Sequence, residues 1–156
     1  MRKILSIPAV AIAMAISAVA LGGETVSNAT RQDMLTAMKA EAFAYAKYKL
    51  YSEQARKNGN EALAALFERT AADEFDKHFK EQAKYIGLVK SDHMNLVDAM
   101  SGEYVEYTQM YLDMAKRAEA AGDASSARYF TEIAADESNH RDAFKAALAT
   151  PSRGKD

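Results

Sequence analysis

The chain has 156 residues, a formal net charge of −2 and a pI near 5.9. Without an excess of basic residues, nothing in its charge favours nucleic acid or an anionic membrane surface as a partner. The absence of cysteine excludes disulfides, zinc–thiolate sites and iron–sulfur clusters. Once the N-terminal segment is set aside, about 130 residues remain, enough for one domain with a hydrophobic core.

The N-terminal segment has the pattern of a secretory signal peptide. A basic start is followed by an apolar run over residues 4–21, which contains a small-x-small cleavage sequence ending at Ala20. We expect residues 1–20 to be a signal peptide and residues 21–29 a linker, so that the domain is periplasmic or otherwise exported. An uncleaved membrane anchor is the alternative, because about 18 apolar residues just suffice to cross a bilayer. Cleavage would leave no stable membrane contact.

The rest of the chain predicts an all-α fold, because apolar residues recur at helical spacing and Ala, Glu, Lys and Met are abundant. Helices are expected at about residues 30–57, 60–86, 91–121 and 124–149, within a domain of residues 30–150 that precedes a disordered tail over residues 151–156. Gly59-Asn60 and Gly122-Asp123 are matching breaks. In each, a glycine ends one helix and an Asn or Asp caps the next.

The matching breaks belong to an internal repeat that relates the two halves of this domain. Ala-Asp-Glu at residues 72–74 recurs in register at residues 135–137, and Glu41 lies over Glu103. We therefore interpret the chain as two related helical hairpins that face each other in an antiparallel four-helix bundle. A two-metal site on the pseudo-two-fold axis is what such a duplication would build.

Glutamates interrupt the apolar stripe of all four predicted helices. They are Glu41, Glu74, Glu103, Glu106 and Glu137, and His140 lies one turn beyond the last of them. Any one of them, taken alone, could be a rim residue that reaches water. Clustered together, buried carboxylates repel one another and need cations or protons to neutralise them. A glutamate from each of two helices, with Glu-x-x-His from each of the other two, is the ligand set of a di-iron or di-manganese bundle. The pattern therefore predicts a two-metal site and redox chemistry with dioxygen or peroxide.

The second predicted helix departs from this ligand set. The repeat aligns Lys77, rather than a histidine, with His140, and His78 stands one residue later. Measured from Glu74 along an ideal α-helix, Lys77 falls at about −60° and His78 at about +40°, on the side of the apolar residues. We predict that His78 takes the ligand position. The alternative is that Lys77 points its ammonium at the carboxylates and that one metal has fewer ligands.

Three residues are candidates for catalysis from their placement. Glu106 lies one turn after Glu103, where it could deliver a proton or let one metal change its ligands, unless it is a rim residue. Tyr48 and Tyr111 lie about two turns beyond Glu41 and Glu103. From there they could hydrogen-bond a ligand carboxylate, and ordinary core packing is the alternative.

Several motifs also match those of a known family. They are Thr70-Ala71-Ala72-Asp73-Glu74, Gly102-Glu103-Tyr104-Val105-Glu106-Tyr107 with Met110-Tyr111, and Ala134-Ala135-Asp136-Glu137-x-x-His140. Over about residues 30–149 the chain resembles the ferritin-like domain of rubrerythrins. The resemblance implies that two iron ions are bound by Glu41, Glu74, Glu103, Glu106, Glu137 and His140. It implies that Tyr48 and Tyr111 support the ligand carboxylates.

The activity implied by the resemblance is reduction of hydrogen peroxide at the diferrous centre. A ferroxidase or iron-handling protein that uses dioxygen is an alternative, and so is a non-enzymatic helical bundle with a degenerate site. Manganese or a mixed-metal pair is the alternative to iron, because a carboxylate-rich site accepts either metal.

Three features depart from the resembled family. Members of the family have a histidine at the position that Lys77 occupies here. They usually carry a cysteine-ligated rubredoxin domain that supplies electrons, and they are usually cytoplasmic. Because this chain has no cysteine, an unidentified electron-donor protein is the expected partner, alongside hydrogen peroxide or dioxygen.

The connection between the second and third helices predicts a homodimer. In the ferritin-like fold these helices run parallel, so the connection crosses about 30 Å if each helix runs ten residues past the metal level. About six free residues span at most ~20 Å. We therefore predict a domain-swapped dimer in which each site takes one hairpin from each subunit. An up-down bundle with a simple short turn is the alternative.

Overall fold

The computed structural model describes residues 26–150. The predicted signal peptide, most of the predicted linker and the predicted tail lie outside the described residues. Within this range every regular element is a helix, so the all-α class is confirmed. None of the helices in the described part of the chain is both long and apolar enough to span a membrane.

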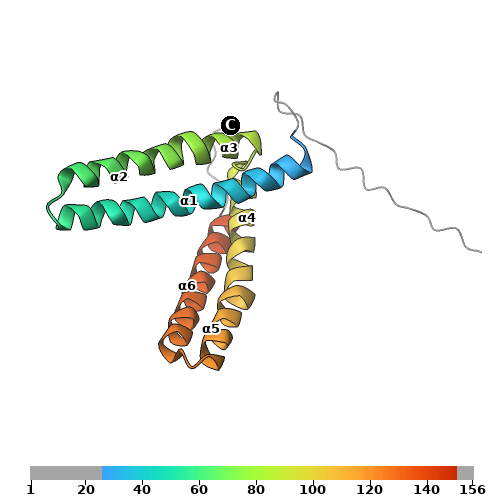
Figure 1. Cartoon of the computed structure of the whole chain (residues 1–156). Helices are drawn as coiled ribbons and strands as arrows, with labels where there is room; N and C mark the ends of the chain where they lie inside the picture. Colours follow the sequence, from blue (N-terminus) through green and yellow to red (C-terminus); the bar gives the residue numbers. More distant parts are fainter. Residues whose placement is uncertain (1–25, 151–156) are drawn as a thin grey trace, which may run out of the picture. The chain divides into compact units, whose positions relative to one another are not determined.

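The helices form two compact units that divide between Ile86 and Gly87. The first unit contains α1 (Asn28–Lys57), α2 (Glu61–Asp73), the π-helical segment η1 (Glu74–Phe79) and α3 (Lys80–Tyr85). The second contains α4 (Asp92–Val105), the π-helical segment η2 (Glu106–Met110), α5 (Tyr111–Ala120) and α6 (Ala124–Ala149). Each unit is a hairpin of two long helical rods, as predicted: α1 runs beside α2, and α6 runs beside α4 and α5 (Figure 1).

The helix ends follow from local capping. The first helix begins at Asn28, two residues before the predicted start, because Ser27 accepts a hydrogen bond from the Thr30 amide at 3.1 Å. Asn60 caps α2 in the predicted way by accepting from Leu63 at 3.1 Å. The prediction for Asp123 was wrong, since its side chain makes no capping hydrogen bond at the start of α6.

Gly59 and Gly122 end the first rod of each hairpin in the left-handed conformation, with φ of 73° and 83°. A side chain at either position would strain this backbone, which glycine adopts freely. The two breaks are thus the same turn used twice, in agreement with the predicted repeat.

Segment η2 accounts for one place where the number of positions between equivalent residues of the two hairpins changes. Glu103 follows Glu41 by 62 positions, whereas Tyr111 follows Tyr48 by 63, so the second hairpin has one extra residue in this stretch. The π-helical turn lies within that stretch. A π-bulge takes up one additional residue inside a helix, so both rods keep their inward-facing residues in register.

Segment η1 accounts for a second place, where the number of positions between equivalent residues changes in the opposite direction. Glu137 follows Glu74 by 63 positions and His140 follows His78 by 62, so here the first hairpin has the extra residue. The π-helical segment begins at Glu74 and includes His78. Both departures from α-helical geometry therefore lie beside the predicted ligands, and the sequence showed them only as a change of one position in the repeat interval.

Small side chains bring α1 and α2 together. Ala55, Ala64 and Ala71 are 5%, 0% and 0% exposed, and Ser52 is 1% exposed. The Ser52 hydroxyl donates to the Ala64 carbonyl oxygen at 3.0 Å, so the polar group is satisfied inside the contact. The close approach of the two backbones depends on these small residues.

The open end of the first hairpin is closed by a separate apolar cluster. Met38, Ala83 and Ile86 are buried there, with Met34, Leu35 and Phe79 packed against them. Arg31 donates from Nη1 to the Ile86 carbonyl oxygen at 2.6 Å. These contacts fasten the end of α3 to the beginning of α1.

The second hairpin has much less core of its own. Ala134 is its one fully buried apolar residue in the described range, at 6% exposed. The apolar stripe along α4, η2 and α5, which includes Leu96, Met100 and Met114, is only half-buried. This hairpin therefore retains an apolar face that its own helices do not cover.

Enlarging Ala64 to leucine should destabilise the first hairpin, because the side chain would force α1 and α2 apart. Overpacking of a tight contact costs about 1–3 kcal/mol, and the urea midpoint of unfolding should fall accordingly. Ala62→Leu, which adds the same side chain at an exposed position of α2, is the matched control. Equal midpoints for the two variants would contradict the packing described here.

Candidate metal centre

The first hairpin brings Glu41, Glu74 and His78 together. One ligand atom from each of the three residues lies within 4.8 Å of the others. The Nδ1 atom of His78 is 2.7 Å from Oε2 of Glu74 and 3.8 Å from Oε1 of Glu41. The two carboxylates are largely covered, at 15% exposed for Glu74 and 27% for Glu41, while the imidazole is 52% exposed. We call these residues the first triad.

The second hairpin builds the same arrangement from Glu103, Glu137 and His140. Their ligand atoms also lie within 4.8 Å of one another. The Nδ1 atom of His140 is 2.7 Å from Oε2 of Glu137 and 3.9 Å from Oε2 of Glu103. The imidazole is again the most open group, at 58% exposed. This second triad repeats both histidine–carboxylate distances of the first almost unchanged, as expected for a duplicated hairpin.

The π-helical turn explains how His78 reaches the triad. In α6 the histidine follows its glutamate by three residues, which places both side chains on one face of an α-helix. In η1 the wider turn lets the fourth residue after Glu74 take the equivalent direction. Lys77 points elsewhere: its Nζ pairs with Asp73 at 2.8 Å, and its side chain is 68% exposed. The structure therefore brings His78 into the triad and leaves Lys77 out, and metal ligation by His78 stays a prediction.

The charges within the second triad oppose one another. Burial raises the pKa of Glu103 above its ordinary value, and the adjacent carboxylates of Glu137 and Glu106 raise it further, while His140 acts in the opposite sense. The hydrogen bond with Glu137 raises the pKa of His140. Crowded carboxylates of this kind favour a bound proton or a bound cation.

The donor set fits a first-row divalent metal. Such metals bind nitrogen and oxygen ligands at about 2 Å, so the ligands of one ion lie up to about 4 Å apart. Small side-chain rotations would bring the atoms of each triad into that range. Carboxylate oxygens with an imidazole nitrogen suit iron or manganese, and thiolate-preferring ions have no ligand in this cysteine-free chain.

Glu106 and Tyr111 lie near the second triad without belonging to it. Glu106 is half-buried at the start of η2. Burial raises the pKa of Tyr111, and the charges of Glu106 and Glu137 raise it further. The Tyr111 ring also stacks on Phe130 with centroids 6.4 Å apart. The catalytic roles predicted for both residues, and the metal-ligand role that the resemblance implies for Glu106, stay predictions.

Tyr48, the counterpart of Tyr111, sits among aromatic rings. Its centroid is 6.0 Å from that of Phe67 and 6.2 Å from that of Tyr51. Its hydroxyl makes no hydrogen bond to a ligand carboxylate among residues 26–150. The ring contacts of Tyr48 are those of core packing. Its predicted catalytic role stays a prediction.

One neighbour of the second triad was not singled out from the sequence. The Arg141 guanidinium lies 5.1 Å from the ring centroid of Tyr107, and its Nη2 is 3.1 Å from Asp142. Its Nε is buried without a hydrogen-bond partner in the described part of the chain. The repeat aligns Arg141 with Phe79, so this positive charge is special to the second hairpin. That mismatch within the repeat was the signal available in the sequence.

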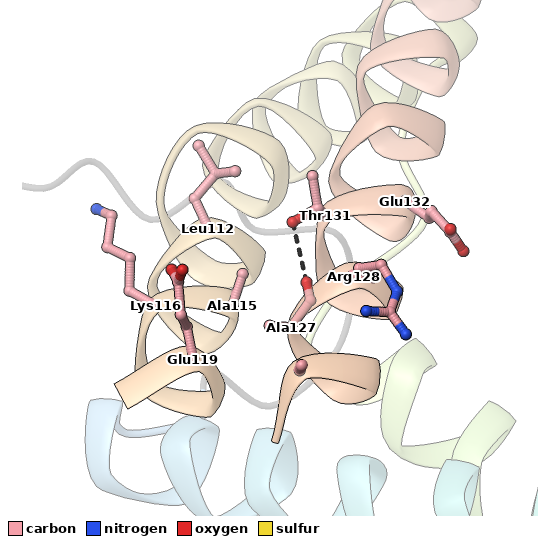
Figure 2. Close-up of a pocket in the computed structure, with 9 residues that line it drawn as sticks. Leu112, Ala115, Lys116, Glu119, Ala127, Arg128, Thr131 and Glu132 are labelled. Carbon is pink, nitrogen blue, oxygen red and sulfur yellow. Dashed lines mark hydrogen bonds between the residues drawn. The ribbon is translucent and has the colours of Figure 1, made fainter. Parts of the chain in front are cut away.

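A groove of about 620 Å³ between α5 and α6 lies apart from the second triad. Figure 2 shows its lining, which comprises Leu112, Ala115, Lys116, Glu119, Ala124, Ala127, Arg128, Thr131 and Glu132. The Thr131 hydroxyl donates to the Ala127 carbonyl oxygen at 2.9 Å along the helix. None of the triad residues lines this groove, so the candidate metal ligands are identified by their donor geometry alone.

Comparison with known proteins identifies the family. The family model described as Rubrerythrin matches residues 34–148, which is most of the chain. The chain belongs to the rubrerythrin family. The predicted resemblance is thereby confirmed, and both triads fall inside the matched region.

Three curated relatives show the extent of the similarity. Rubrerythrin from Nitratidesulfovibrio vulgaris is 31% identical over 128 residues, which cover 74% of this chain and 66% of that protein. Nigerythrin from the same organism is 27% identical over 137 residues, covering 80% and 68%. Rubrerythrin from Porphyromonas gingivalis is 30% identical over 133 residues, covering 77% and 66%. The chain thus spans about two thirds of the length of these relatives.

A solved structure described as the fully reduced, all-ferrous state of nigerythrin is also similar. The match covers 100% of this chain and 83% of that one, at 26% identity and a TM-score of 0.42.

Replacing His78 with alanine should weaken metal binding by more than about tenfold, because the first triad would lose its nitrogen donor. Lys77→Ala is the matched control, since Lys77 pairs with Asp73 outside the triad. Iron per chain, measured after dialysis against a weak chelator, distinguishes the two variants. An unchanged count of two in His78→Ala would contradict the ligand role.

Deleting Lys77 should preserve metal binding. The deletion removes the extra residue that η1 accommodates, so the histidine would follow Glu74 by three residues, as in α6. We expect an uninterrupted α-helix here, visible in amide hydrogen-bond couplings by NMR, with wild-type iron content. Loss of iron from the deletion variant would show that the π-helical turn itself is required.

Proposed function

We propose that this chain is a non-haem di-iron oxidoreductase that reduces hydrogen peroxide. The observation that carries the proposal is the pair of matching triads, each with two glutamates and one histidine. Together they supply six donors, which is the number contributed by four helices in di-iron carboxylate proteins of the ferritin-like class. Membership of the rubrerythrin family supports the same assignment.

Reduction of one hydrogen peroxide molecule to two water molecules takes two electrons and two protons. Bound ferrous iron would supply the electrons, one from each ion. The chain's own residues then have two tasks, which are to hold the metals with the triads and to deliver protons. We assign proton delivery to the carboxyl group of Glu106. Tyr111, through its hydroxyl hydrogen, would orient a ligand carboxylate.

Electrons must be replaced after each turnover. We propose that a separate protein donates them, because the sequence contains no cysteine with which to hold an iron–sulfur or rubredoxin-type centre of its own. Hydrogen peroxide is the proposed substrate, and dioxygen is the competing oxidant.

We also propose that the domain works outside the cytoplasm. The support is the signal-peptide pattern of residues 1–20. N-terminal sequencing of the protein from fractionated cells should find a mature start just after Ala20 in the soluble exported fraction. An intact N-terminus in the membrane fraction would establish the anchor alternative.

The direct test of the activity uses protein loaded with ferrous iron under anaerobic conditions. Two irons per chain, both oxidised by one equivalent of peroxide and faster than by dioxygen, would support the proposal. Glu81→Ala, an exposed change away from both triads, should behave as wild type. Faster oxidation by dioxygen would point to an iron oxidase. Failure to retain iron would indicate a degenerate site.

Glu106→Ala should slow peroxide reduction while leaving iron content unchanged. The repeat aligns Glu106 with Ala44, so the change makes the second hairpin resemble the first, and both triads remain complete. Loss of a general acid typically costs about 10²–10⁴-fold in rate. A rate of peroxide reduction within threefold of wild type would contradict the role in proton delivery. Loss of one iron would show that the role of Glu106 is not limited to proton delivery.

A further inference from the structure

Three aromatic rings of the second hairpin lead from a half-buried phenol to an exposed one. The Tyr111 ring on α5 stacks on the Phe130 ring of α6 with centroids 6.4 Å apart, and the Tyr129 ring also lies 6.4 Å from that of Phe130. Rings at this spacing are in contact. Tyr111 is half-buried, whereas Tyr129 is 61% exposed. The three rings therefore form an unbroken aromatic path to the surface of this hairpin.

The inner end of this path lies within electrostatic reach of the second triad. Burial raises the pKa of Tyr111, and the charges of neighbouring groups raise it further, namely those of Glu106, Glu137, Tyr129 and Glu103. A raised pKa keeps the phenol protonated, so Tyr111 holds both an electron and a proton that it can give up. The negative charges of the acids also favour loss of an electron from the ring, because they stabilise the positive charge that remains.

The other half-buried tyrosine near the second triad is a poorer electron donor. The guanidinium of Arg141 lies over the ring of Tyr107, 5.1 Å from its centroid. A cation in this position is attracted to a neutral ring and repelled by a ring that has lost an electron. Arg141 therefore protects Tyr107 from oxidation and leaves Tyr111 as the easier tyrosine to oxidise.

The first hairpin has a similar line of rings, which the duplication alone does not explain. Tyr48 lies 6.0 Å from Phe67, and Phe67 lies 5.3 Å from Tyr51, which is 47% exposed. The repeat aligns the inner tyrosines and the phenylalanines of the two lines with each other, but it aligns Tyr51 with Met114. The two exposed tyrosines thus come from unrelated positions, one on α1 and one on α6, and each extends its line to the surface.

A positive charge sets the inner ring of the first line apart. The ammonium of Lys47 lies 5.1 Å from the ring centroid of Tyr48 and disfavours loss of an electron from that ring. No such cation lies over Tyr111 among the cation–ring contacts of residues 26–150. We therefore restrict the inference to the second hairpin.

We propose that Tyr111, Phe130 and Tyr129 form a relay that carries an oxidising equivalent from the second triad to the surface. The inference rests on the proposed reaction with peroxide. A centre that holds one ferrous ion supplies just one of the two electrons that peroxide takes up, and Tyr111 supplies the other. One ferrous ion, one phenol, one hydrogen peroxide molecule and one proton then give one ferric ion, one phenoxyl radical and two water molecules.

The radical then moves outward. Tyr129 gives an electron to the Tyr111 radical through the ring of Phe130, releases its phenolic proton to water, and becomes a phenoxyl radical, while Tyr111 takes up a proton. At the surface a small one-electron reductant such as ascorbate restores Tyr129 by supplying an electron, and water returns the proton. The relay thus spares the ligand side chains from oxidation when the centre is one electron short.

The test loads the wild-type chain with one ferrous ion per chain, without oxygen, and adds one equivalent of peroxide with a nitroso spin trap. The trap should be found on Tyr129, which is the one tyrosine of the tryptic peptide over residues 129–141. Tyr85 is the internal control, because it is 64% exposed and belongs to none of the aromatic pairs within residues 26–150. Its tryptic peptide, residues 85–90, should stay unlabelled.

Two variants examine the path itself. Phe130→Leu keeps an apolar side chain but removes the bridging ring, so labelling of Tyr129 should be lost although Tyr129 is still present. Tyr129→Phe should prolong the tyrosyl signal seen by electron paramagnetic resonance after rapid freezing, because Tyr111 can no longer pass the radical on. With two irons per chain, Tyr129→Phe should reduce peroxide at the wild-type rate.

The outcomes separate the relay from the proposed reaction. Iron that is oxidised by peroxide without a label on Tyr129, equal labelling of Tyr85, or undiminished labelling in Phe130→Leu would overturn the relay alone. Labelling of Tyr129 in a protein whose iron reacts faster with dioxygen would overturn the peroxidase function and support the relay. Failure to retain iron would overturn both.

Discussion

Each hairpin places two carboxylates and one imidazole where an apolar stripe would otherwise continue. Glu74 and Glu137 are only 15% and 14% exposed, so they have lost much of the water that would stabilise their charge. Each is partly compensated by a histidine at 2.7 Å, but a second glutamate stands close by in both triads. A divalent cation relieves this repulsion more completely than one imidazole can, because it interacts favourably with both carboxylates at once. The helices, turns and small-residue contacts serve to hold these groups together against that repulsion.

The two π-helical segments keep equivalent side chains of the two hairpins in register. A single extra residue in an α-helix rotates everything beyond it by about 100°, which would turn ligands away from the site. In η1 the widened turn absorbs that residue at the point where His78 must meet Glu74. In η2 it absorbs a residue between Glu103 and Tyr111. The two hairpins therefore present equivalent triads although their sequences differ in length at both places.

Stability and metal binding are expected to be linked in this protein. The first hairpin has a contact made of small residues and a closing cluster, but the second buries just Ala134 completely in the described range. A hairpin with so little core gains much of its stability from whatever covers its apolar face. A metal ion bound to a triad would stabilise the folded hairpin that presents it, because binding to the folded form favours that form.

The sequence by itself determined the four helical rods, the two turns at Gly59 and Gly122, and the four glutamates of the triads. These features depend on local information: helical periodicity, the backbone freedom of glycine and the recurrence of the same residues in both hairpins. Only the tertiary structure decided between Lys77 and His78, because the direction of a side chain after a π-helical turn depends on how that turn packs against α1. The contact of Arg141 with Tyr107 was likewise decided by the tertiary structure, because it joins α6 to η2. The sequence showed only that Arg141 has no counterpart in the first hairpin. Local patterns define which residues share a helix face, whereas packing between helices determines which of them meet.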